Sequence, residues 1–153
     1  MTKDSKSPVL EIRRVFDAPP ARVFEAWLDR DEWASWIGPE GVRCDLPLFE
    51  PRVDGRYRLT MHLPDGKVLP VAGVFTAIEK NKSFCFTWGM EGDPRQTLVT
   101  VELRNLNGRT ELKLRHEGLP SAADRDDHGK GWNSALNKLA AHLATKSATP
   151  ASQ

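Results

Sequence analysis

The stretch VTVELRNLNGRTELKLRH, residues 99–116, contains the features that decide the fold. Two alternating runs of apolar and polar residues flank Asn107-Gly108, a dipeptide typical of a two-residue β-hairpin turn. Such a turn fixes the pairing register of its strands. We therefore predict a hairpin with a charged face and an apolar face that ends at one ionisable residue, His116. The opposed pairs are Leu106 with Arg109, Leu103 with Leu112, Val101 with Leu114, and Val99 with His116.

The elements around this hairpin predict the rest of the architecture. A run of strands extends from Val42 to Glu117, and an earlier strand at Val9–Phe16 is followed by two short helices between Pro19 and Ile37. A long amphipathic helix is predicted to begin near Asp126-Asp127. Only a sheet is large enough to cover its apolar side, so we predict an α+β fold with a curved antiparallel sheet of six to seven strands around this helix. Its apolar side carries Trp132, Leu136, Leu139 and Leu143.

The composition describes one ordinary globular domain. The chain has 153 residues, of which 39% are hydrophobic and 28% charged. A chain of this length can bury one hydrophobic core that is stable without a disulfide bond or a bound metal. We predict a flexible N-terminus at residues 1–8, a single domain at 9–144, and a disordered tail of small and polar residues at 145–153. The formal net charge of +1 gives no basic field for a phosphate backbone, so nucleic acid is not an expected partner.

The two cysteines, Cys44 and Cys85, lie in predicted strands without metal-binding spacing, which favours a reduced cytoplasmic chain. The first seven residues lack the apolar core of a secretory signal. No apolar run reaches the roughly 20 residues needed to cross a bilayer, so membrane insertion is not expected. Metal, nucleotide and nucleophile motifs are also absent, and we predict no metal and no cofactor.

Several segments, taken in order, resemble the activator-of-Hsp90-ATPase-like branch of the START/SRPBCC superfamily. The resemblance implies a helix-grip fold, in which a sheet holds a long C-terminal helix over a hydrophobic cavity. One departure is Asp54, where the family usually has the first glycine of a pair, and it affects only a turn. The matching segments are Phe16–Pro19, Val23–Trp27, Trp36–Pro39, Asp54–Arg58, Phe86–Trp88, and His128–Trp132 with Leu136 and Leu139.

The implied cavity is the candidate binding site. We predict that large apolar residues on the inward faces of strands and helices line this cavity. Residues of this kind also pack an ordinary hydrophobic core, which is the alternative interpretation. The predicted ligand-binding residues are Trp33, Trp36, Tyr57, Leu59, Met61, Trp88, Val99, Val101, Leu114, His116, Trp132 and Leu136.

Two histidines have specific expected roles. His116, at the edge of an apolar pocket, either hydrogen-bonds a ligand, acts as a general base, or is held by a backbone carbonyl at the strand end. His128 is expected to order the loop before the final helix, and Trp132 to anchor that helix to the sheet.

Three functions are consistent with these features. The leading hypothesis is a small cytoplasmic protein that binds a hydrophobic or amphipathic small molecule. The second is a chaperone-associated or stress-response interaction module, and the third is a cyclase-like enzyme that uses His116 or Tyr57 in the cavity. No catalytic residues are assigned, the sequence favours a binding protein over an enzyme, and monomer and homodimer both remain open.

Overall fold

The computed structural model describes residues 9–148, with side chains described for residues 9–144. The order of elements is the predicted α+β order, with two short helices after the first strand and one long helix at the end. The elements are β1 Leu10–Phe16, α1 Pro20–Leu28, α2 Arg30–Trp36, β2 Arg43–Phe49, β3 Arg56–His62, β4 Val68–Glu79, β5 Ser83–Met90, β6 Thr97–Leu106, β7 Arg109–Glu117 and α3 Ala122–Ala148.

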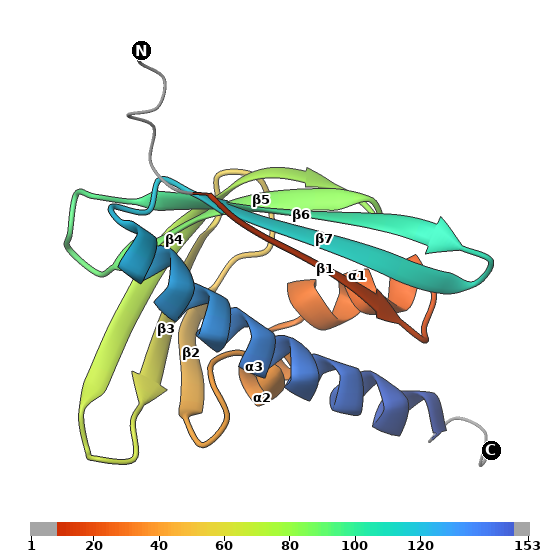
Figure 1. The fold of residues 1–153 in the computed structure, drawn as a ribbon, viewed down its shortest axis with the longest axis horizontal. Helices are drawn as coiled ribbons and strands as arrows, with labels where there is room; N and C mark the ends of the chain where they lie inside the picture. The colour runs from red at the N-terminus through yellow and green to blue at the C-terminus, as the bar shows by residue number, and fades with distance from the viewer. Residues whose placement is uncertain (1–8, 149–153) are drawn as a thin grey trace.

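The strands form a seven-stranded antiparallel sheet in the order β1-β7-β6-β5-β4-β3-β2. Figure 1 shows that β2, β3 and β4 turn away from the plane of the other strands, so that the sheet curves around α3. The β4–β5 register shifts between Phe75 and Ala77, and such an irregularity bends and twists a sheet. The structure therefore confirms the predicted helix-grip architecture.

The register of the β6–β7 hairpin is the predicted one. Val99 pairs with His116, Val101 with Leu114, and Leu106 with Arg109 across the turn. Val99 and His116 are both fully buried. The apolar face of the hairpin thus points inward, as the Asn107-Gly108 turn and the alternating pattern predict.

Tyr57 reaches across β4 because its neighbour there has no side chain. Tyr57 pairs with Gly73 of β4, and its hydroxyl donates to the Thr87 carbonyl oxygen on β5 at 2.5 Å. A Cβ atom at Gly73 would lie 2.1 Å from that carbonyl oxygen and 2.7 Å from the Tyr57 ring. Gly73 therefore allows one buried side chain to connect three neighbouring strands at the curved part of the sheet.

The long helix begins earlier and ends later than the sequence analysis placed it. Ser121 caps the first turn, since its Oγ accepts from the Asp124 amide at 3.1 Å and donates to the Asp124 carboxylate at 3.0 Å. The helix therefore begins at Ala122 rather than near Asp126-Asp127. The helix also includes residues 145–148, which were predicted to belong to the disordered tail. No glycine or proline occurs between residue 145 and Pro150, so the sequence allows the helix to continue. The predictions for 1–8 and 149–153 fall outside the described residues.

Aromatic side chains from α1 and α2 fill the middle of the curved sheet. The ring of Trp27 lies 4.7 Å from Trp36 and 5.2 Å from Phe84, measured between centroids. Trp33 lies 5.4 Å from Tyr57, and the Trp36 indole donates to the Ala26 carbonyl oxygen at 3.1 Å. The concave space is thus closed at its centre.

A polar clasp of Arg22, Glu32 and His142 joins the three helices. Arg22 of α1 donates to both oxygens of Glu32 of α2, at 2.6 and 3.3 Å, and His142 of α3 lies 2.8 Å from the same carboxylate. The Glu32 side chain is 12% exposed. Burial opposes ionisation, but the hydrogen bonds from Arg22 and His142 outweigh it and lower the pKa of Glu32.

Replacing Glu32 by glutamine tests the clasp. Because its pKa is lowered on folding, ionised Glu32 stabilises the fold above the unfolded-state pKa of about 4.5, and this contribution is lost as the pH falls through the folded-state pKa. We expect Glu32→Gln to lower the free energy of unfolding by about 1–2 kcal/mol at neutral pH. The two proteins should converge at acidic pH in a series of urea denaturations.

Glu25→Gln is the matched control. Glu25 also contacts Arg22, at 3.1 Å, but its side chain is 62% exposed. An exposed ion pair contributes about 0–1 kcal/mol, so this change should cost clearly less than Glu32→Gln. Equal losses in the two variants would show that the clasp is not what joins the helices.

Candidate functional site

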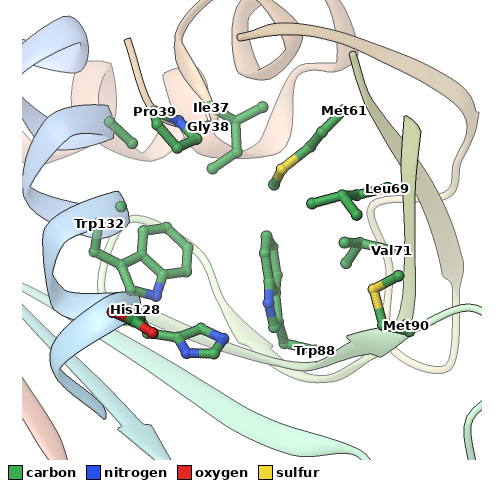
Figure 2. Close-up of a pocket in the computed structure, with 13 residues that line it drawn as sticks. Ile37, Gly38, Pro39, Met61, Leu69, Val71, Trp88, Met90, His128 and Trp132 are labelled. Carbon is green, nitrogen blue, oxygen red and sulfur yellow. The ribbon is translucent and has the colours of Figure 1, made fainter. Parts of the chain in front are cut away.

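A pocket of about 280 Å³ lies at one end of the concave space, between α3, the segment after α2, and strands β3 to β5. Figure 2 shows the side chains that surround it. Most of these side chains are apolar. The lining residues are Ile37, Gly38, Pro39, Met61, Leu69, Val71, Trp88, Met90, Asp127, His128, Gly131, Trp132 and Ala135.

Two tryptophans on different elements contact each other and together form one side of the pocket wall. Trp88 comes from β5 and Trp132 from α3, and their ring centroids lie 5.4 Å apart. Met61 and Met90 lie beyond Trp88 in Figure 2. Indole rings and thioethers are large, polarisable groups that make favourable contacts with aromatic molecules.

Residues 37–40 form the opposite rim and are fixed to α3. Lys138 Nζ lies 3.4 Å from the Ile37 carbonyl oxygen and 3.3 Å from that of Pro39. The Glu40 amide donates to Ser134 Oγ at 2.7 Å. These contacts hold the rim in place without a ligand, so the pocket is preformed.

The imidazole of His116 is held by hydrogen bonds on both nitrogens. The Trp132 indole N–H donates to its Nδ1 at 3.1 Å, so Nδ1 carries no proton. Nε2 therefore carries the proton of the neutral ring and donates to Thr97 Oγ1 at 2.7 Å, whose hydroxyl donates to the Trp88 carbonyl oxygen at 2.7 Å. Burial, and less strongly the nearby His128, lower the pKa of His116 to about 3. His116 is thus a structural group without a free nitrogen.

His128 and Asp127 are the ionisable residues of the pocket lining. His128 Nδ1 lies 2.8 Å from the Asp124 carbonyl oxygen one helical turn earlier, so Nδ1 must be the protonated donor. Its ring contacts the His116 ring edge-on, with centroids 5.0 Å apart. His128 lies inside α3 rather than in a loop before it. The second nitrogen, Nε2, has no partner among the described residues.

Three of the twelve predicted ligand-binding residues line this pocket, namely Met61, Trp88 and Trp132. The others are buried in the core beside it, where the Tyr57 hydroxyl is bound to the Thr87 carbonyl oxygen. These nine core residues are Trp33, Trp36, Tyr57, Leu59, Val99, Val101, Leu114, His116 and Leu136.

Most of the residues that line the pocket were not predicted from the sequence. Leu69 and Val71 belong to a strand that is apolar on both faces, so the pattern did not show which face is inward. His128 and Gly131 lie within the quoted helix-start motif, and that motif was the available signal for a site there. Ile37 and Pro39 were recognised as the end of a helix and as part of a family motif, but they were not predicted to bind a ligand.

Cys44 lies behind the rim and is inert. Its Sγ donates to the Ile37 carbonyl oxygen at 3.3 Å, and burial raises the pKa of the thiol to about 11. Within residues 9–148, no group of three or more His, Cys, Asp or Glu side chains is arranged to hold a metal ion. In the same range, no helix is long and apolar enough to cross a membrane.

The sequence profile of the family described as "Activator of Hsp90 ATPase homolog 1-like protein" matches residues 17–144. The chain belongs to this family. The match includes α1, α2, the bent strands and the part of α3 that contributes to the pocket. It confirms the resemblance inferred from the short motifs.

Solved structures of similar proteins share the fold of this chain. A protein from Chromobacterium violaceum is 28% identical with a TM-score of 0.83, and the match covers 88% of this chain and 96% of that chain. The AHSA1 protein from Silicibacter pomeroyi is 29% identical with a TM-score of 0.81, covering 91% and 99%.

Curated relatives matched by sequence are longer than this chain. Tapasin from Canis lupus familiaris is 28% identical over an alignment of 138 residues, and the match covers 80% of this chain and 29% of tapasin. The chain therefore spans less than a third of the length of that relative.

The protonation of the two pocket-side histidines can be tested directly. Because of their hydrogen bonds, we expect the Nε2–H tautomer for His116 and the Nδ1–H tautomer for neutral His128. With a pKa of about 3, His116 should remain neutral when the pH is lowered to roughly 5. Long-range ¹H–¹⁵N correlation spectra of the imidazoles measure both properties. A His116 signal that titrates near pH 6.5 would contradict the assignment.

Proposed function

We propose that this protein binds a compact apolar or aromatic small molecule in the pocket lined by Trp88 and Trp132. The observation that carries the proposal is a preformed, mostly apolar pocket of about 280 Å³. This volume is close to the lower end of the range of small-molecule sites, about 300–1,000 Å³. It fits a ligand with one or two rings better than a long acyl chain.

The expected affinity follows from the apolar area that such a ligand buries. A two-ring molecule that loses roughly 250 Å² of apolar surface gains about 6 kcal/mol at 25 cal/mol per Å². The ligand loses translational freedom on binding, and this loss offsets part of the gain. Because the rim and the wall are already fixed, the protein loses little further conformational entropy when the ligand binds. We expect a simple probe to bind with a dissociation constant between about 100 μM and 1 mM.

The contacts of the polar core residues support binding rather than cyclisation chemistry. His116 uses both ring nitrogens in hydrogen bonds, and the Tyr57 hydroxyl is bound to a backbone carbonyl oxygen outside the pocket. Neither residue lines the pocket, so neither is placed to act as its general acid or base. The free thiols of Cys44 and Cys85 fit a reducing compartment such as the cytoplasm.

Naphthalene is a suitable probe for the proposed pocket, and calorimetry measures its binding. Leu69 lines the pocket and Val68, its neighbour on β4, is exposed. We expect Leu69→Trp to weaken naphthalene binding at least about ten-fold, because the larger side chain occupies ligand space. Val68→Trp adds the same ring on the other side of the strand and should leave binding unchanged.

Two results would count against the proposal. One is the absence of naphthalene binding to the unchanged protein, and the other is equal binding by the Leu69→Trp and Val68→Trp variants. The family description also suggests a measurement of Hsp90 ATPase rate with and without this protein. A changed rate in the absence of any binding would favour the chaperone-associated function instead.

A further inference from the structure

We infer, on the basis of the proposed function, that the pocket selects an uncharged ligand with a hydroxyl group on its ring system, as in a phenol or naphthol. The two ionisable residues of the lining, Asp127 and His128, are adjacent on α3, while the other lining side chains are apolar or aromatic. A ligand with one small polar group at one edge therefore matches the distribution of polar atoms around the pocket.

His128 supplies a hydrogen-bond acceptor at this end. Its Nδ1 donates to the Asp124 carbonyl oxygen, so Nε2 of the neutral ring offers a lone pair and has no partner among the described residues. His128 lines the pocket, and Figure 2 shows its ring extending from α3 toward Trp88, with the outer nitrogen on the side of Trp88. The edge contact with His116 restrains the ring in this position.

Trp88 supplies a donor beside this acceptor. Its indole nitrogen lies on the side of the ring that faces His128 in Figure 2, and the indole N–H can only donate. No hydrogen bond joins the Trp88 indole to His128 among the described residues. A ligand hydroxyl can donate to His128 Nε2 and accept from Trp88 Nε1, which satisfies both groups at once.

Asp127 disfavours an anionic ligand at the same end. Its carboxylate is exposed at the pocket and belongs to the residue next to His128. A ligand carboxylate placed against His128 would lie near a like charge. This arrangement favours a neutral hydroxyl over a carboxylate.

The experiment compares four probes that differ only in their polar group: naphthalene, 2-methoxynaphthalene, 2-naphthol and 2-naphthoate. Calorimetry at neutral pH measures each affinity. We expect 2-naphthol to bind at least about five-fold more tightly than 2-methoxynaphthalene, which accepts but cannot donate a hydrogen bond. We expect 2-naphthoate to bind more weakly than naphthalene, and Asp127→Asn to reduce that difference.

Two substitutions of His128 separate its acceptor from its structural contact. His128→Asn keeps an amide donor near the position of Nδ1, where it can still bond the Asp124 carbonyl oxygen, but removes the acceptor at Nε2. His128→Gln places an amide oxygen within reach of the Nε2 position. We expect the preference for 2-naphthol over 2-methoxynaphthalene, measured within each variant, to disappear in His128→Asn and to persist in His128→Gln.

The outcomes distinguish this inference from the proposed function. If none of the four probes binds, the proposed function fails and the inference fails with it. If naphthalene binds but 2-naphthol shows no preference, or keeps its preference in His128→Asn, the inference alone is overturned. Tighter binding of 2-naphthoate than of 2-naphthol would also overturn it, because it would identify a site for an anion.

Discussion

A buried chain of hydrogen bonds fixes the two walls of the pocket relative to each other. It begins at the Trp132 indole of α3, passes through His116 and Thr97, and ends at the backbone carbonyl of Trp88. Each polar atom along this chain has a partner, so its burial carries little penalty. The helix thus has a defined position on the sheet, and the contact between the two tryptophans is set by the fold.

The architecture could be predicted because local and long-range signals agreed. Asn107-Gly108 fixed one register, and that register placed Val99 and His116 on the inward face, where both are buried. The start of α3 was misplaced because the carboxylates at Asp126-Asp127 were interpreted as a cap. Ser121 is the observed cap, and a serine followed three residues later by an acidic residue is itself a recognised start signal.

The pocket was harder to predict than the fold. Periodicity identifies side chains that face inward, but it does not show which inward space is already filled. Trp27 and Phe84, together with Trp33, occupy the centre of the sheet, so residues such as Val101 pack as core. The pocket of about 280 Å³ lies where β3 and β4 bend away. That position depends on the register shift in β4, a tertiary feature without a clear sequence signal.

The same hydrogen bonds that define the pocket limit its chemistry. His116 is neutral with both nitrogens engaged, so it cannot transfer a proton to a ligand without breaking the contact with Trp132 or Thr97. His128 differs, because it lines the pocket and only one of its nitrogens has a partner among the described residues. His116 therefore positions the pocket wall, while His128 is available to a ligand. This division of roles suits selective binding in a preformed site.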